Sequence, residues 1–378
     1  MRIVIAPNAF KGSLTAVEAA LCIAKGLKKS QLSCTLQLIP IADGGDGTAR
    51  LISKKLSAKT MKALVHDPLG KKIEASYGWL STSKTAIIEL ADASGLKLLN
   101  PGKLNPLKSN TRGTGELIKS ALNKGAKKIM LAVGGSATVD GGTGLLNELG
   151  VNFLDKYGNK IKELPKGLLA LNQIDVSSID PRLKDCEIIL LCDVTNKLLG
   201  KNGAAAIFGP QKGADQKEVA LLERCLYQLN KIVKKEVGID MDSFKYGGSA
   251  GGVAAGMAAF TNAKLLNGIF YYLDIIGFEN ELKTADLLIT AEGKFDSQTL
   301  DGKGPYGVAE KAWQHNIPVI LLAGQVPLKI SKHLHHYFSA VLPIGFAPVS
   351  IKEAIKNTAA DLERTAMELG DLLALKKK

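Results

Sequence analysis

The chain of 378 residues is 46% hydrophobic, which is enough for about two or three domains with cores of their own. Its formal charge of +13 comes from 49 Lys and Arg against 36 Asp and Glu. The lysines are scattered over predicted helix faces and aromatic residues make up 5%, which argues against nucleic-acid binding through base stacking. The five cysteines form no CxxC pair and no apolar run is long enough to cross a bilayer. We therefore expect a cytoplasmic protein without a disulfide framework, a zinc site or a membrane span.

The first predicted elements alternate between strand and helix. The pattern predicts a strand over 2–6, a helix over 14–28 capped by Ser13 or Thr15, a strand over 34–39 and a helix over 48–55. This alternation is typical of a parallel sheet.

The hydrophobic pattern then changes to that of an antiparallel meander, with strands predicted over 61–67, 73–80 and 85–90. The next part mixes helices near 114–124 and 216–236 with strands near 129–133 and 186–192. Residues 246–260 interleave glycine with alanine, as a closely packed helix or a glycine loop that opens one. We interpret residues 58–265 as an inserted α/β domain.

Strand–helix alternation returns towards the C-terminus. Strands are predicted over 285–290, 317–323 and 337–343, and helices over 305–315 and 350–374. Two N-terminal and three C-terminal strands fit a five-stranded parallel sheet. The predicted fold class is therefore α/β, with a discontinuous flavodoxin-like (Rossmann-like) domain at 1–57 and 266–378 around the insert.

Glycine-rich loops follow several predicted strands, and open α/β sheets bind their ligands at these strand ends. The strongest such loop follows the strand near 129–133 and opens a helix, so its backbone N–H groups suit phosphate oxygens. The alternative is a structural turn in which the aspartate caps the helix. The candidate nucleotide ligands in this loop are Gly134, Gly135, Ser136, Ala137, Thr138, Asp140 and Gly141.

Carboxylates are the second feature of the strand ends. Magnesium takes one or two carboxylates together with phosphate oxygens and water, and a kinase needs a base near the acceptor hydroxyl. Any one of these acids is as easily explained as a cap or a turn residue, but five in the same position favour a site. They are Asp43, Asp46, Asp193, Glu292 and Asp296.

Two cations and two formal motifs complete the candidates. Lys11 in the first loop and Arg112 before a helix are candidates to hold an anion. The P-loop GxxxxGK[ST] is absent, and the GxGxxG match at 302–307 stands too far from its strand for dinucleotide binding, which leaves Lys303 as a charge near the site. Residues 247–251 match the GxSxG elbow, so a hydrolase that uses Ser249 stays open as an alternative. A non-catalytic sensor of a sugar acid or a nucleotide is another.

Taken in order, the strand-end segments resemble the type-1 glycerate kinase family. In this family Asp is usual where Asn8 stands, Glu is common at Asp46, and Gly is usual at Ala291. The matching segments are 6–14 (APNAFKGSL), 42–48 (ADGGDGT), 112–118 (RGTGELI), 134–142 (GGSATVDGG), 192–196 (CDVTN), 208–214 (FGPQKGA), 248–252 (GSAGG) and 292–300 (EGKFDSQTL).

The resemblance implies an enzyme that phosphorylates D-glycerate with ATP and Mg²⁺ in a cleft between two α/β domains, and the bacterial type implies the 2-phosphate. We expect a monomer or homodimer with no nucleic-acid or membrane partner. Asp193 is the expected metal ligand, and Asp296, Lys11 and Asp193 are the expected catalytic residues. Ser249 joins the nucleotide ligands. The expected glycerate ligands are Lys11, Asp43, Arg112, Glu292 and Lys303.

Overall fold

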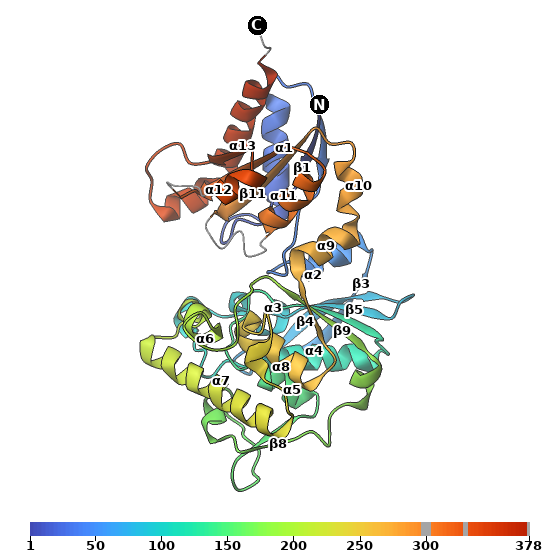
Figure 1. Ribbon diagram of the computed structural model, residues 1–378, viewed down its shortest axis with the longest axis vertical. Helices are drawn as coiled ribbons and strands as arrows, with labels where there is room; N and C mark the ends of the chain where they lie inside the picture. The colour runs from blue at the N-terminus through green and yellow to red at the C-terminus, as the bar shows by residue number, and fades with distance from the viewer. Residues whose placement is uncertain (296–303, 328–331, 376–378) are drawn as a thin grey trace. The chain divides into compact units, whose positions relative to one another are not determined.

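The computed structural model describes residues 1–295, 304–327 and 332–375, and the chain divides into two compact units (Figure 1). The first unit comprises Met1–Asp43 and Ile269–Lys378, and the second comprises Gly44–Gly268. The predicted domains have boundaries after 57 and 265, so residues 44–57 and 266–268 belong to the second unit and not, as predicted, to the first. The reason is a tertiary contact: in the second unit, Glu89 accepts a hydrogen bond from the backbone of Ala49, and Gly78 packs against Ser53.

The first unit is built on a parallel sheet of five strands in the order β13-β12-β11-β1-β2. Its strands are β1 (Arg2–Ile5), β2 (Thr35–Leu38), β11 (Leu287–Lys294), β12 (Val319–Gln325) and β13 (Ala340–Pro343). Its helices are α1 (Ala16–Lys29), α9 (Gly268–Ile276), α10 (Phe278–Leu282), α11 (Gly304–Gln314), α12 (Lys332–Tyr337) and α13 (Ile351–Ala374).

Both faces of the central strands β1, β11 and β12 are buried, as expected for parallel strands that read as continuous apolar runs. In β1, Ile3 and Ile5 belong to the core shared with α1 and α13, which lie side by side (Figure 1), and Val4 between them is also buried. Helix α1 begins at Ala16, two residues after the predicted start, because Thr15, one of the two predicted caps, forms a reciprocal capping box with Glu18.

The second unit contains a six-stranded sheet in the order β10-β9-β6-β5-β4-β3 and a two-stranded sheet of β7 and β8. The predicted meander is confirmed, because β3, β4 and β5 pair antiparallel, while β5, β6, β9 and β10 are parallel. The strands are β3 (Lys59–His66), β4 (Lys72–Leu80), β5 (Thr85–Glu89), β6 (Lys128–Ala132), β7 (Asn152–Leu154), β8 (Gln173–Asp175), β9 (Glu187–Cys192) and β10 (Lys264–Asn267).

Helices pack against this mixed sheet to form one continuous core. The α-helices are α2 (Thr48–Lys55), α3 (Ala91–Ser94), α4 (Arg112–Asn123), α5 (Thr143–Glu148), α6 (Ala204–Phe208), α7 (Gln216–Glu236) and α8 (Ser249–Phe260). Short 3₁₀ turns lie at Leu96–Leu98, Pro101–Lys103, Lys166–Ala170, Pro181–Asp185, Pro210–Lys212 and Met241–Ser243. The predicted glycine–alanine segment is both a loop and a helix, because Ala250, Gly251 and Gly252 have left-handed φ angles at the start of α8.

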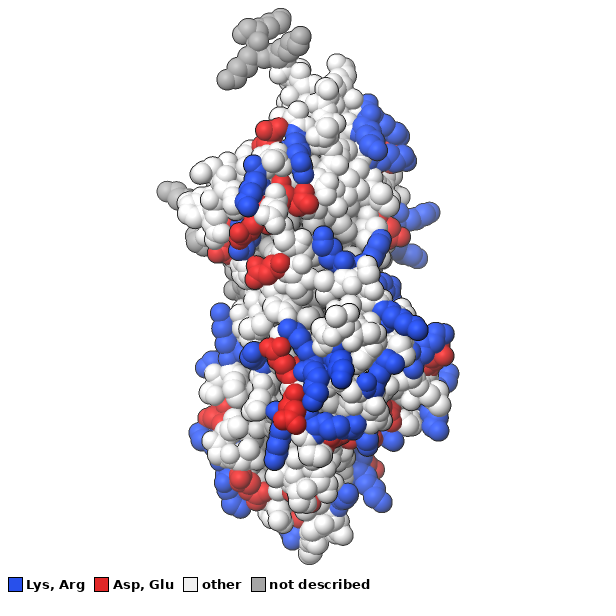
Figure 2. Space-filling view, turned by 90° about the vertical axis from the view of Figure 1, so that its right-hand side faces the viewer, with Lys and Arg blue, Asp and Glu red and all other residues white. Residues whose placement is uncertain are grey.

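The surface charge agrees with the composition. On the face that Figure 2 shows, Lys and Arg side chains are numerous, and Asp and Glu side chains lie among them. None of the helices within the described residues combines the length and the apolar character needed to cross a bilayer.

The contact between α1 and α13 gives a test of the first unit. A Cβ atom at Gly26 would overlap the carbonyl oxygen of Glu363 and lie 2.8 Å from the Cβ of Ala366. We expect Gly26→Ala to lower the free energy of unfolding by about 1–3 kcal/mol, because overpacking outweighs a helix-propensity gain of up to about 1 kcal/mol. Urea unfolding measures the change. Gly345→Ala is the matched control, because its Cβ would meet nothing within 4 Å; equal midpoints for the two variants would contradict the packing argument.

Candidate functional site

The predicted strand-end loops of the second unit leave the sheet at one edge. Strands β6 and β9 are parallel neighbours, so the loop after β6 (residues 133–142, the β6 loop) and the loop after β9 (residues 193–203, the β9 loop) start side by side. The β6 loop carries most of the candidate nucleotide ligands, and the β9 loop begins with Asp193. The parallel pairing therefore brings these two sets of candidates together.

Glycines let three backbone segments meet at this edge. A Cβ at Gly134 would overlap the Cα of Gly45, and a Cβ at Gly251 would overlap the carbonyl oxygen of Thr138. The N–H of Gly141 donates to the carbonyl of Gly251 at 3.0 Å. These glycines are needed because the backbones approach more closely than any side chain permits.

Asp140 has a structural role in this arrangement. It is fully buried, and its carboxylate accepts hydrogen bonds from the N–H and Oγ1 of Thr111 and from the N–H groups of Gly142 and Gly144, at 2.7–3.1 Å. Burial raises the pKa of Asp140, although the hydrogen bonds from Thr111, Gly144 and Gly142 act in the opposite direction. The donors at the start of α5 are thus occupied by the protein's own carboxylate. These contacts favour the structural alternative for Asp140, whose carboxylate holds the start of α5 from two residues before the N-cap residue Gly142, over an assignment to a nucleotide phosphate.

Access to the β6 loop is confined to its beginning. Within residues 134–142, all of which the structure describes, Gly135 alone is exposed. Thr138 is fully buried, and its Oγ1 has no hydrogen-bond partner among the described residues. A buried hydroxyl without a hydrogen-bond partner costs free energy. A bound group or a small movement of the loop would supply the missing partner.

Lys212 is a site residue that the sequence analysis did not identify. Its side chain is buried, and its Nζ donates to the Oγ of Ser136 and to the carbonyl oxygen of Thr138, both at 2.7 Å. Burial lowers the pKa of Lys212 to about 7, against the opposite influence of Asp140 and Asp193. The lysine belongs to the segment 208–214 that carried part of the resemblance, and this was the available signal.

The donor set suits nucleotide phosphate and a single-carboxylate magnesium site. Asp193 is half-buried directly after β9, and it acts electrostatically on Lys212. Among the described residues, no group of three or more His, Cys, Asp and Glu side chains gathers as a complete metal site. Magnesium bound through phosphates needs only one or two carboxylates, so the residues present fit that ion.

Ser249 lacks the surroundings of a hydrolase nucleophile. It is fully buried, its Oγ donates to the carbonyl of Val194 at 3.2 Å, and the residues before it form a turn where the elbow requires a strand. The segment serves instead to bring Gly251 against the β6 loop. The hydrolase alternative therefore finds no support in the geometry.

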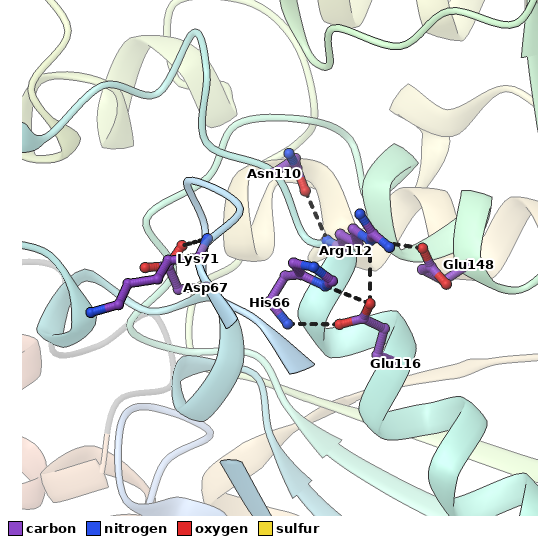
Figure 3. A network of polar contacts seen from close by, with 7 residues as sticks. All are labelled: His66, Asp67, Lys71, Asn110, Arg112, Glu116 and Glu148. Atoms are coloured by element: carbon purple, nitrogen blue, oxygen red, sulfur yellow. Dashed lines mark hydrogen bonds and ion pairs between the residues drawn. The ribbon is translucent and has the colours of Figure 1, made fainter. Parts of the chain in front are cut away.

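Arg112 is held by carboxylates of the protein itself (Figure 3). Its Nε lies 2.9 Å from Glu148 and 3.2 Å from Glu116, and its backbone N–H donates to the Oδ1 of Asn110. Glu116 also lies 2.7 Å from the Nδ1 of His66 and accepts the backbone N–H of that residue. This network ties α4 to α5 and β3, and it accounts for Arg112 without a substrate.

The candidates of the first unit lie at the carboxyl edge of its parallel sheet. Asn8 follows β1, and its Nδ2 donates to Asp43 at 2.7 Å. Lys11 is exposed, and its backbone N lies 3.6 Å from the position of a Cβ at Gly293, beside the buried Glu292. The edge thus carries an amide and two carboxylates, and the backbone of the exposed Lys11 runs beside them. The predicted Asp296 and Lys303 lie outside the described residues.

Comparisons with known proteins agree with these features. The sequence profile of the Glycerate kinase family matches residues 3–374. This chain belongs to the glycerate kinase family. It is 40% identical to the glycerate kinase of Halalkalibacterium halodurans over 97% of both chains, and 40% identical to the glycerate 2-kinase of Escherichia coli over 99% of this chain and 98% of the relative. A crystal structure of a candidate glycerate kinase 2 from Salmonella typhimurium LT2 has a TM-score of 0.79 at 39% identity, over 99% of this chain and 98% of the other.

Membership in this family of kinases confirms the resemblance read from the sequence.

Glu89 is a second buried ionisable residue that the sequence analysis did not identify. Glu89 ends β5 at the same edge, and its Oε2 accepts the N–H of Ala49 at 2.8 Å while its Oε1 is buried without a partner among the described residues. Burial raises the pKa of Glu89 to about 8, with Asp46 and Asp92 acting in the same direction. The signal in the sequence that could have identified Glu89 was its position at the end of a predicted strand.

The capping role of Asp140 is testable without any ligand. We expect Asp140→Asn to lower the free energy of unfolding by about 2–4 kcal/mol, because an amide replaces the carboxylate oxygen that accepts the N–H groups of Thr111 and Gly144. Urea unfolding of the nucleotide-free protein measures this. Asp155→Asn, in an exposed turn, is the control. An Asp140→Asn protein of undiminished stability would contradict the assignment.

The raised pKa of Glu89 predicts a dependence of stability on pH. The folded protein holds a proton on Glu89 that the unfolded chain releases near pH 4.5, so this group's contribution to stability is greatest below that pH and is lost as the pH rises to about 8. We expect Glu89→Gln, which stays neutral, to raise the melting temperature relative to the parent at pH 8.5 by several degrees more than at pH 5.5.

Thermal melts at the two pH values, in one ionic strength, test this. Glu74→Gln on the exposed side of β4 is the matched control and should shift the melting temperature equally at both. A Glu89→Gln effect that is the same at pH 5.5 and pH 8.5 would show that the carboxyl is ionised throughout.

Proposed function

We propose that this chain transfers the γ-phosphoryl group of ATP to D-glycerate in the presence of Mg²⁺ and forms 2-phosphoglycerate. The observation that carries the proposal is the family match over residues 3–374, which includes both sets of strand-end residues. The position of the phosphate follows the name of the Escherichia coli relative, a glycerate 2-kinase.

The nucleotide phosphates are proposed to bind at the start of the β6 loop, where Gly135 is exposed. Gly134, Ala137 and Gly141 shape this loop, Ser136 and Thr138 supply hydroxyls, and Ser249 supports it from α8. Asp193 would hold the magnesium ion, which supplies charge neutralisation on the phosphates. The buried Lys212 lies behind the loop, where its Nζ donates hydrogen bonds to Ser136 and Thr138.

Glycerate is proposed to bind through the edge of the first unit. Lys11 is exposed and suits the glycerate carboxylate. Asn8 donates its amide hydrogen to Asp43, which orients that carboxylate to accept a hydrogen bond from a substrate hydroxyl. Glu292 is a second acceptor, and Asp296 remains our proposed base for the reacting hydroxyl.

Arg112 and Lys303 are the remaining proposed glycerate ligands. The two carboxylate partners of Arg112 make its role the one that the geometry supports least. Because the nucleotide residues belong to the second unit and the proposed glycerate ligands other than Arg112 to the first, we propose that turnover requires residues of both. Positioning and fixed charges then supply most of the rate enhancement.

We also propose the flavodoxin-like class for the first unit. Its sheet has the strands in the order second, first, third, fourth, fifth along that unit's sequence, and this order is the one found in flavodoxin-like sheets.

The decisive measurement is the product. We expect the protein, incubated with D-glycerate, ATP and Mg²⁺, to form 2-phosphoglycerate, identified by the proton-coupled ³¹P resonance. A 3-phosphoglycerate signal would correct the position, and absence of ADP formation with D-glycerate would overturn the kinase. Ligand binding without turnover would favour the sensor.

Variants test the residue roles. We expect Asp193→Asn to lower kcat by about 100-fold or more, because the metal loses its only protein carboxylate in the proposal. We expect Lys11→Met to raise the KM for glycerate about tenfold, with ATP little affected, because a charge-assisted contact is worth roughly 1.5–3 kcal/mol. Lys28→Met, an exposed lysine of α1, is the control. Parent-like kinetics of Asp193→Asn would remove that residue from the metal site.

A further inference from the structure

The β6 loop is in contact with a buried lysine, Lys212. Lys212 has 2% of its surface exposed, which is rare for a lysine because removing an ammonium group from water is costly. A residue that only shaped the turn would be replaced by an apolar side chain without that cost. The burial of Lys212 therefore indicates that its charge or its hydrogen-bond donors have a function at this position.

The turn that carries Lys212 is rigid. Lys212 ends the 3₁₀ turn Pro210–Lys212, and Gly213 follows with a φ of 97°, where a Cβ would lie 2.7 Å from that of Leu104. The N–H groups of Lys212 and Gly213 are bonded within the turn, to Gly209 and Pro210. The backbone thus fixes the direction from which the ammonium group approaches the β6 loop.

One of the two contacts of Lys212 is with Thr138, the residue whose hydroxyl has no partner among the described residues. The Nζ uses two of its three hydrogens on Ser136 Oγ and Thr138 O, and the third has no hydrogen-bond partner among the described residues. The Oγ1 of Thr138 is buried and equally without a partner there. A buried hydroxyl without a partner, on the residue whose carbonyl holds a buried lysine, indicates a loop prepared for an anionic ligand.

We propose that Lys212 is a positioning residue for the nucleotide: it holds Ser136 and Thr138 so that the exposed start of the β6 loop, at Gly135, is shaped and charged for phosphate. Lys212 acts through the loop, since its own side chain is buried. This inference rests on the proposed function, because it names a residue for the nucleotide side of that reaction.

The experiment measures the affinity of Mg²⁺·ADP by titration calorimetry, independently of turnover, for the parent, Lys212→Met, Ser136→Ala and the double variant. We expect Lys212→Met to weaken ADP binding at least tenfold and Ser136→Ala about threefold, with the KM for glycerate changed less than twofold. Because Lys212 acts through Ser136, the double variant should bind ADP no more weakly than Lys212→Met, whereas independent roles would multiply the two losses.

Lys201→Met is the matched control, because this lysine is exposed in a nearby part of the same unit. Melting temperatures of all variants distinguish a lost contact from a lost fold. If Lys212→Met does not fold, Ser136→Ala and Thr138→Val carry the test: Thr138→Val removes the unpartnered hydroxyl, so it should leave the melting temperature equal or higher and still weaken ADP binding.

Three results would overturn the inference: ADP affinity of Lys212→Met within twofold of the parent, equal losses for ADP and glycerate, or multiplicative losses in the double variant. Unaltered ADP affinity of both Ser136→Ala and Thr138→Val would overturn it as well. A parent protein that binds ADP but forms no phosphoglycerate would overturn the proposed function alone, and the affinities would still decide the role of Lys212.

Discussion

The close approach of three backbone segments at the carboxyl edge of the mixed sheet is the constraint on which the second unit depends. Residues at 134 and 251 lie where any Cβ would overlap the backbone of a neighbouring segment, so glycine is required at both. Once the backbones are in contact, space for side chains is small and polar groups must be satisfied locally. Asp140 meets this need for the start of α5, and Lys212 meets it for the middle of the β6 loop.

A loop built in this way is stiff, and stiffness has a chemical use in phosphoryl transfer. The protein contributes little covalent chemistry to such a reaction, so it contributes by holding charges where the transition state needs them. The buried ammonium of Lys212 and the half-buried carboxylate of Asp193 are opposite charges at one sheet edge. A metal ion on the carboxylate and phosphates on the loop would complete an arrangement of alternating charge.

Much of the fold follows from local sequence patterns. The limits of α2 and the capping box of α1 are readable because they depend on neighbouring residues. The assignment of α2 to the second unit cannot be read from the local sequence, because it depends on the contact of Ala49 with Glu89. The sequence analysis singled out Asp193 and Asp140 for the same reason, because each belongs to a loop that follows a strand. This reasoning cannot tell a ligand-binding aspartate from a structural one, because the hydrogen-bond donors of Thr111 reach Asp140 only in the folded chain.

Lys212 shows the same limit for a residue that the sequence analysis did not identify. A lysine in a sequence is assigned to the surface by default, since burial of its charge is costly. Nothing adjacent to it in the sequence reveals that Ser136, 76 residues away, accepts a hydrogen bond from its Nζ. The residues proposed to touch a ligand stand at strand ends, which is why the sequence alone suggests them. The residues that hold them in place are determined by tertiary contacts, so a site predicted from motifs alone lacks these supporting residues.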